Sequence, residues 1–368
     1  MNLKQILGFS AGLAFASIAS AQTVDITISG STAFRADAYR SIRSMYDGGA
    51  PALQNPVHVS NSNTGGSNIV TFSGLMTPLF GTRTVIIRTS YSGSVDGIKD
   101  VAQGNTQPFI TNPDPTGGFG TTPIIPDFAF SDVYQSSTQF GSPMLTDTQC
   151  GVLPFVWVRN NACSNSVVNM TSKLAQGTFP LGQFPIGQWS GNVADLGVNL
   201  NVVGRDTSSG TRVVTLAETA YGIFTPLTQR KVSGGIYVDD NTGYGSDGSV
   251  AADLNLNAGA AISYLDLSDA GKVTGFTSPG AQLTHDGVPY SAANVQNGKY
   301  TFWSYEHFFH KSGLSTDKTT FRGAATTLPF TAGSFLATVN TEIGANTSAL
   351  QIGSMNVSRL ADGAVVTP

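Results

Sequence analysis

Residues 24–34 read VDITISGSTAF, and this stretch sets a pattern that the rest of the chain repeats. Apolar and polar residues alternate from Val24 to Ser29, which predicts a strand. The residues 30–32 (GST) interrupt the alternation, and apolar residues then recur at helical spacing from Phe34 onward. The stretch therefore predicts a strand, a short turn of small residues and a helix in direct succession.

Two further segments follow the same design, a predicted strand leading through Gly, Ser and Thr into a predicted helix: they are 84–101 and 200–220. Other strands are predicted at 127–131, 151–158 and 260–267. Alternation of strands and helices favours layered α/β units with largely parallel sheets. A chain of 368 residues also exceeds one ordinary core and suits about two domains.

The first 21 residues are expected to be a secretion signal. Lys4 supplies a positive charge, residues 6–19 are apolar, and Ala19-Ser20-Ala21 fits a cleavage site. The apolar stretch is shorter than the roughly 20 residues of a membrane helix, although an N-terminal membrane anchor is the rival interpretation. No later stretch is long and apolar enough to span. We therefore expect a periplasmic or secreted protein without a membrane span after cleavage.

The charge content is low, because only 11% of the residues are Asp, Glu, Lys or Arg, against about 25% in an average domain. The formal net charge is −4, and basic residues form no run. Nucleic acids and anionic membranes are therefore excluded as electrostatic partners.

The two cysteines, Cys150 and Cys163, are predicted to form a structural disulfide. A lone pair usually bridges in an oxidising compartment. An apolar run at 152–158 is followed by the turn-like residues 159–161 (RNN), so a strand that folds back would bring the two sulfurs together. A redox or metal-binding pair is the alternative, but it lacks further ligands nearby.

The three turns are candidate anion sites, because the N-terminus of a helix exposes unpaired N–H groups and a partial positive charge. Small residues let an oxyanion approach the backbone. Arg205, at the start of the third turn, adds a planar guanidinium that suits a tetrahedral oxyanion. Each turn alone is also explained by an ordinary helix cap, and it is the repetition together with Arg205 that favours binding.

These segments, in this order, resemble the phosphate-binding protein of bacterial phosphate ABC transporters. The matching motifs are GSTAF at 30–34, GSVDGIK at 93–99, DFAFSD at 127–132, Arg-x-x-x-Ser-Gly-Thr at 205–211 and the segment 245–265. The resemblance implies a class II periplasmic-binding-protein fold, with two α/β lobes joined by a hinge around a ligand cleft. Lobe 1 is expected to combine 22–134 with 268–368, and lobe 2 to hold 135–267.

The resemblance also implies the residues that hold phosphate or a related oxyanion: Thr32, Ala33, Phe34, Ser94, Asp132, Arg205, Ser209, Gly210 and Thr211. Asp132 would accept the proton of hydrogen phosphate, which sulfate lacks at neutral pH. This chain departs from the family in two places. The hydroxyl before Phe34 either comes from Thr32, one position early, or is lost. Where the family often has an acid two residues after the arginine, this chain has Thr207, and Asp206 stands beside Arg205 instead. The partner of Arg205 therefore stays open.

These features imply a monomeric solute-binding protein that delivers its ligand to an ABC transporter permease, without enzymatic activity, cofactor or metal. His307 and His310 could supply at most two ligands of a metal site. Residues 239–243 (DDNTG) resemble part of a calcium-binding loop but lack its terminal Glu. A secreted phosphatase and an extracellular adhesion or matrix protein on the same scaffold stay open as alternatives. The long polar excursions at 48–81 and 103–126 are expected to be surface features of undetermined role.

Overall fold

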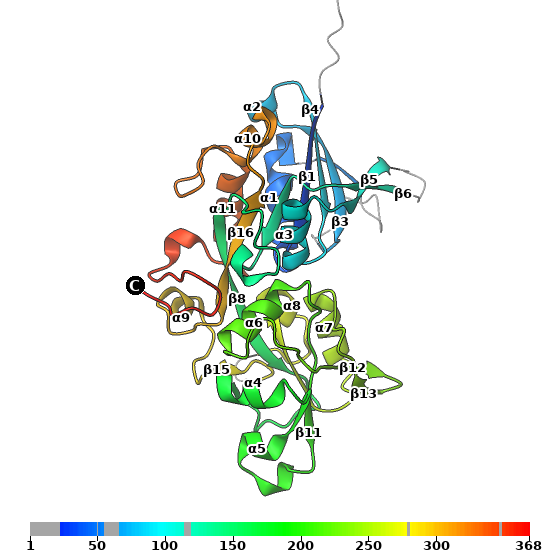
Figure 1. The fold of residues 1–368 in the computed structure, drawn as a ribbon, viewed down its shortest axis with the longest axis vertical. Helices are drawn as coiled ribbons and strands as arrows, with labels where there is room; N and C mark the ends of the chain where they lie inside the picture. Colours follow the sequence, from blue (N-terminus) through cyan, green and yellow to red (C-terminus); the bar gives the residue numbers. More distant parts are fainter. Residues whose placement is uncertain (1–22, 50, 55–65, 114–118, 278–279, 346–347) are drawn as a thin grey trace, which may run out of the picture.

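The structure is a computed structural model, and it describes residues 23–49, 51–54, 66–113, 119–277, 280–345 and 348–368. The predicted signal at 1–21 lies outside the described residues, as do parts of both excursions. The described chain forms two lobes, drawn one above the other in Figure 1.

One ten-stranded sheet runs through both lobes. From one edge to the other its strands are β2 (Ala52–Gln54), β3 (Ile69–Leu75), β4 (Thr84–Ser90), β1 (Val24–Gly30), β7 (Phe128–Ser131), β16 (Trp303–His310), β8 (Gln149–Arg159), β14 (Ala261–Asp266), β11 (Asn199–Val202) and β10 (Gln183–Pro185). In the first lobe β1 pairs in parallel with both β4 and β7. Their carboxyl ends therefore meet at one edge of the sheet.

The helices of the first lobe are α1 (Arg35–Met45), α2 (Thr77–Phe80), α3 (Ser94–Gln103), α10 (Thr316–Arg322) and α11 (Phe335–Gly344). Those of the second lobe and of the connection between the lobes are α4 (Ser172–Thr178), α5 (Ile186–Ser190), α6 (Gly210–Glu218), α7 (Asp247–Leu254), α8 (Leu267–Ala270) and α9 (Ala292–Gln296). The predicted strand–turn–helix units correspond to β1–α1, β4–α3 and β11–α6, so this part of the sequence prediction is confirmed.

The two lobes are connected through β8, which pairs with β16 on one side and with β14 on the other, antiparallel in both cases. All residues of β8 after Gln149 are buried. The lobe boundaries stay a prediction. The short strand β15 (Thr284–His285), expected in the first lobe, pairs with β9 (Asn169–Met170), which belongs to the segment expected in the second.

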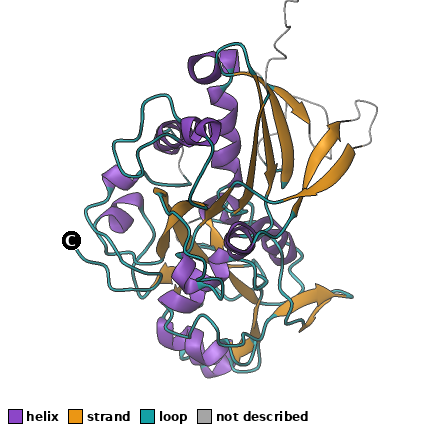
Figure 2. Cartoon of the chain, turned by 45° about the horizontal axis from the view of Figure 1, so that its top comes forward, coloured by secondary structure: helices purple, strands orange, loops and turns teal. Residues whose placement is uncertain are grey.

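The excursions hold regular structure among their described residues. The first contains β2, β3 and α2. The second forms an antiparallel hairpin of β5 (Gln107–Pro113) and β6 (Phe119–Ile124). A second hairpin, β12 (Arg230–Ser233) and β13 (Ile236–Asp239), belongs to the other lobe. Figures 1 and 2 show that both hairpins extend to the same side of the molecule.

The predicted disulfide is wrong, because the structure has Cys150 and Cys163 as separate buried thiols. Cys150 is the second residue of β8, which continues without reversal to Arg159. A strand rises about 3.3 Å per residue, so Cys150 and Arg159 lie roughly 30 Å apart. A disulfide requires Cα atoms within about 7 Å, and four residues beyond Arg159 cannot return that distance. The turn after residue 159 ends the strand instead of folding it back on itself.

We expect two slowly reacting thiols in the folded protein. Burial raises the pKa of both, to about 12 for Cys163, and the thiolate is the reactive form. Iodoacetamide should modify neither cysteine in the native protein and both after unfolding without a reductant, as counted by intact mass spectrometry. A requirement for reductant before either cysteine reacts would show that a disulfide exists.

Candidate anion-binding site

The first-lobe part of the site is built at the shared carboxyl edge of β1, β4 and β7. Gly30 ends β1 with φ +106°, and a Cβ there would lie 1.9 Å from the carbonyl oxygen of Phe130, so only glycine fits this close approach. The N–H of Ser31 donates to the same carbonyl oxygen at 2.9 Å. The Oγ of Ser31 accepts the N–H of Phe34 at 3.2 Å. The turn after β1 is thereby held rigidly against β7.

The second-lobe part is the N-terminus of α6. Ser209 is the N-cap of this helix, and its side chain accepts the N–H of Arg212 at 3.2 Å. Gly210 and Thr211 form the first helical turn, and both are buried. The hydroxyl of Thr211 donates to Oδ2 of Asp247 at 3.1 Å. The Ser-Gly-Thr motif therefore forms a capped helix start that is fixed from its side by α7.

Arg205 is the central charge of a buried cluster that also contains Asp247, Thr32 and Asp132. Its side chain is only 1% exposed. Its Nη1 lies 2.8 Å from Oδ1 of Asp247. Its Nε and Nη2 donate to the carbonyl oxygens of Tyr244 and Gly245, both at 3.0 Å. Nη2 also donates to Oγ1 of Thr32 at 3.2 Å, across the boundary between the lobes. Burial disfavours the charged guanidinium, but the surrounding acids, Asp247 first and then Asp206 and Asp132, together outweigh this effect, and the pKa of Arg205 is raised.

Asp132 faces the start of α6 from the end of β7. Its backbone N–H donates to Oγ of Ser94 at 3.4 Å, and its Oδ1 has no hydrogen-bond partner among the described residues. A Cβ on Gly210 would lie 1.5 Å from this oxygen, so the carboxyl packs directly on the glycine. Burial raises the pKa of Asp132 to about 7, with a lowering effect from Ser94 and a raising effect from Asp247.

Around this cluster the lobes are in direct contact. The N–H of Val95 on α3 donates to the carbonyl oxygen of Ser208 at 3.0 Å. A Cβ on Gly93 would lie 2.4 Å from the same oxygen. Arg35 at the start of α1 lies 4.0 Å from Asp269 on α8. The described conformation is therefore closed, and small residues permit the approach.

A cavity of about 650 Å³ opens beside the cluster, between α3, α6 and the loops at 137–140 and 223–228. Among the described residues, its lining includes Val95 and Ser208, the sequence neighbours of Ser94 and Ser209, rather than the predicted site residues themselves. The closed lobes thus place the predicted residues behind the Val95–Ser208 contact.

The structure brings most of the predicted site residues together at the boundary between the lobes. Direct contacts join Thr32 with Arg205, and Ser94 with Asp132 and Gly210. Phe34 differs from the expectation of a free backbone donor, because its N–H is bonded within the turn and its ring packs on Phe130 at 4.9 Å between centroids. Ala33 is half-buried beside it.

The sequence prediction missed Asp247 as the partner of Arg205. Asp206, the acid next to the arginine, instead accepts the N–H of Ser208 at 3.0 Å. Asp247 begins α7, 42 positions beyond Arg205, and follows the N-cap residue Ser246. The only signal in the sequence was its place in the motif Gly-Ser-Asp-Gly, which matched the family without suggesting a role.

Asp247 also belongs to a group of three buried carboxyls with Asp266 and Asp269, whose oxygens lie within 4.8 Å of one another. Cations accompany them, since Asp269 pairs with Lys272 and approaches Arg35, and Asp247 pairs with Arg205. The group is therefore already compensated by three positive side chains.

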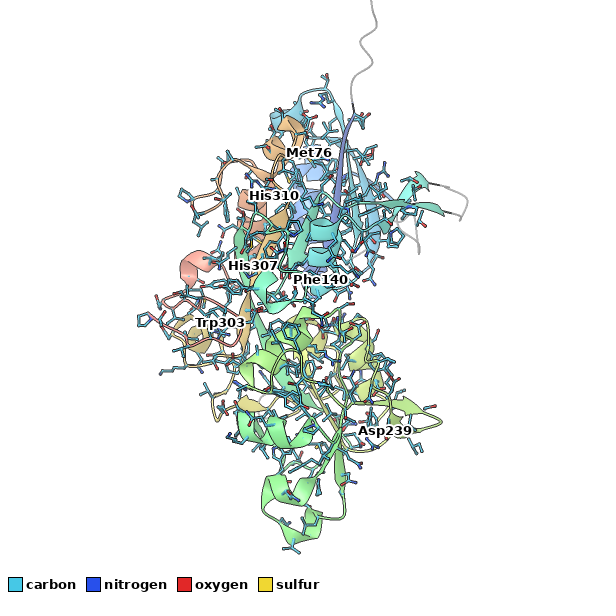
Figure 3. The ribbon with its side chains drawn as sticks, in the orientation of Figure 1. Met76, Phe140, Asp239, Trp303, His307 and His310 are labelled. Atoms are coloured by element: carbon cyan, nitrogen blue, oxygen red, sulfur yellow. The ribbon has the colours of Figure 1, made fainter. Side chains whose placement is uncertain are left out.

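The histidines and the candidate calcium loop lie in other places. His307 Nδ1 lies 2.9 Å from both oxygens of Asp147, whereas His310 Nδ1 lies 2.6 Å from the carbonyl oxygen of Lys311. Figure 3 shows the two histidines in the upper lobe and Asp239 on the hairpin of the lower lobe. These side chains take part in separate local contacts.

No protein-family model matches the sequence, and no curated protein matches it. Among solved structures, a putative phosphate ABC transporter substrate-binding protein with bound phosphate from Clostridium perfringens is similar over 89% of this chain and 99% of its own, with 13% identity and a TM-score of 0.52. An ABC-type phosphate transport receptor from Vibrio cholerae is similar over 80% of this chain and 91% of its own, with 16% identity and a TM-score of 0.47.

The likeness to the Clostridium perfringens structure extends over nearly the whole of both chains, and it concerns the fold. It confirms the predicted class: this chain has the two-lobed α/β fold of a periplasmic binding protein. None of the described helices has the length and apolar character needed to cross a membrane.

We expect Asp247→Ala to destabilise the protein by about 3–5 kcal/mol, because removal of one partner leaves the other charge buried and uncompensated. Denaturant unfolding should report the change in the free energy of unfolding. The matched control is Asp239→Ala, since Asp239 pairs with Arg230 at 2.7 Å but is 69% exposed. That exposed pair should contribute no more than about 1 kcal/mol. Equal losses in both variants would contradict the assignment of Asp247 as a buried anchor.

Proposed function

We propose that this protein captures phosphate or a related tetrahedral oxyanion between its two lobes and presents it to an ABC transporter permease. The observation that carries the proposal is the buried guanidinium of Arg205, which pairs with Asp247 and reaches Thr32 of the other lobe. Nearby, the starts of α3 and α6 are in contact through Val95 and Ser208, and both Arg205 and Asp132 are only 1% exposed. Oxyanions are bound by this combination of charged fork and helix start.

The charge balance of the site favours an anion that carries a proton. Asp247 already compensates Arg205, so the pair is neutral overall. Asp132 adds a buried carboxyl, which repels an anion unless a proton lies between the two. Hydrogen phosphate supplies that proton and sulfate at neutral pH does not, so sulfate would leave two acceptors facing each other. The phosphate bound to the similar protein from Clostridium perfringens supports this choice.

The proposed cycle involves hinge motion and no covalent step. Opening of the lobes would separate Val95 from Ser208 and Thr32 from Arg205, and closure would restore these contacts around the ligand. The hinge would lie where β8 and β16 pass between the lobes. Under this proposal the protein works outside the cytoplasm as a monomer, and the permease recognises the closed form.

Calorimetric titration with phosphate, arsenate and sulfate tests the proposal, and Arg205→Ala tests the site. Charge-assisted hydrogen bonds contribute roughly 1.5–3 kcal/mol each, so we expect the variant to bind phosphate at least tenfold more weakly. Arg205→Lys should recover only part of the affinity, because an ammonium lacks the planar fork. Circular dichroism establishes that each variant is folded. A folded Arg205→Ala protein with the affinity of the parent would exclude this site.

We expect sulfate affinity to rise as the pH falls through about 7, the pKa of Asp132. The folded pKa is raised, so the free protein binds a proton there as the pH falls, and a neutral Asp132 can donate to sulfate. Asp132→Asn should bind sulfate more tightly than the parent at pH 8, with little change between pH 8 and pH 6. Sulfate does not itself titrate in this range, so the protein alone would cause the effect. Identical pH profiles for parent and variant would show that Asp132 does not select the ligand.

A further inference from the structure

Glu306 is a buried acid that the site described so far does not use. It lies in β16, a strand with every residue buried, and is 0% exposed. Neither of its carboxyl oxygens has a hydrogen-bond partner among the described residues. A buried polar group without a partner is costly, and a charged one far more so. The position of this acid therefore requires an explanation.

The strand register places Glu306 beside Asp132. β16 runs antiparallel to β7, and the last pair of the ladder is His307 with Ser131. One residue earlier on β16 and one residue beyond the end of β7, the same register would set Glu306 opposite Asp132. Directly opposed residues of an antiparallel pair have Cβ atoms about 5 Å apart on the same face of the sheet. Phe308 and Phe130, two positions further from this point on each strand, share that face, with ring centroids 4.7 Å apart.

The titratable groups around Glu306 come from every neighbouring element and are mostly acidic. Asp132 at the end of β7 and Asp37 on α1 both raise its pKa, in addition to burial, which is the largest cause. The hydroxyl of Tyr91, after β4, and the thiol of Cys150 on β8 are also affected by it.

Two cations act on the groups beside Glu306, Arg205 on Asp132 and Arg35 on Tyr91. The guanidinium of Arg35 donates to Asn68 at 2.9 Å and lies 4.0 Å from Asp269. Among the described residues, no ion pair involves Glu306. A buried carboxyl that has no ion pair and has a second acid beside it is disfavoured as an anion, so we expect Glu306 to hold a proton.

We propose that Glu306 is a second carboxyl of the oxyanion site, which stays neutral and donates a hydrogen bond to the carboxylate of Asp132. This inference rests on the proposed function and deepens it. The neutral acid would keep the pair at one negative charge, so that a second anion can enter the site. It would also orient Asp132 as the acceptor of the ligand's proton. Glu306 is thus a positioning residue that acts through Asp132.

Two replacements separate this role from simple packing. Glu306→Gln keeps the shape and a donor, so phosphate affinity should stay within about threefold of the parent. Glu306→Leu fills a similar volume without a donor. Loss of a hydrogen bond to a charged acceptor should then weaken phosphate at least tenfold and lower the phosphate-to-sulfate affinity ratio. Asp239→Asn, at an exposed acid on β13, is the control for replacing an acid far from the site.

Calorimetry at pH 7 decides between the outcomes. The proposal is supported if Glu306→Gln keeps the phosphate affinity of the parent while Glu306→Leu loses it. Glu306→Leu with the affinity and selectivity of the parent would overturn it. So would Glu306→Gln binding phosphate tenfold more tightly, because that gain would mean that an ionised Glu306 had been repelling the ligand.

A second measurement tests the protonation state without any ligand. The pKa of Glu306 is raised in the folded protein relative to the unfolded chain. The stability that this proton contributes is therefore fully present below the unfolded pKa of about 4.3, and it is lost as the pH rises through the folded pKa. Between these values the unfolding constant of the parent should increase up to tenfold per pH unit relative to Glu306→Gln. A difference that does not vary with pH would refute the neutral acid. If the parent binds no oxyanion at all, the proposed function fails, while this measurement still decides the state of Glu306.

Discussion

A guanidinium can be buried between two lobes only where acceptors surround it, and the arrangement around Arg205 follows from this constraint. Asp247 supplies the opposite charge, the carbonyl groups of residues 244 and 245 supply neutral acceptors, and Thr32 supplies one acceptor from the other lobe. A buried pair of this kind adds little net stability compared with apolar packing. The pair instead holds the guanidinium in place near the start of α6, where an anion would meet the N–H groups of the first helical turn.

The small residues around this charge are as important as the charge itself. Gly30, Gly93 and Gly210 each stand where a Cβ would collide with the opposing backbone or carboxyl. Parallel strands bring the first-lobe turns to one edge, where Gly30 permits the close contact between β1 and β7. The absence of side chains at Gly93 and Gly210 lets the second lobe approach that edge closely. The site therefore depends on the missing side chains of these three glycines as well as on its hydrogen-bond donors.

The local units were predictable from the sequence, and the contacts between distant segments were not. Alternation in residues 24–29 and the capped start of α6 depend on neighbours in the chain, so strand and helix could be assigned there. The pairing of Arg205 with Asp247 depends on how α7 packs, and no local pattern reports it. The same limit explains the failure at Cys163: the apolar run to residue 158 indicated a strand, but only the partners β14 and β16 show that it continues straight across both lobes. A role for Glu306 could not be predicted from the sequence, because it depends on the register between β16 and β7, which places this acid near Asp132.

The backbone hydrogen bond from Val95 to Ser208 has a consequence for timing. It lies between the neighbouring cavity, which both residues line, and the buried cluster. Under the proposed function, an ion captured in the cluster would leave only when the lobes part. The residence time of the ligand would then be set by the rate of lobe opening and not by the strength of any single contact with the ion. Association would likewise be slower than free diffusion in proportion to the fraction of molecules that are open.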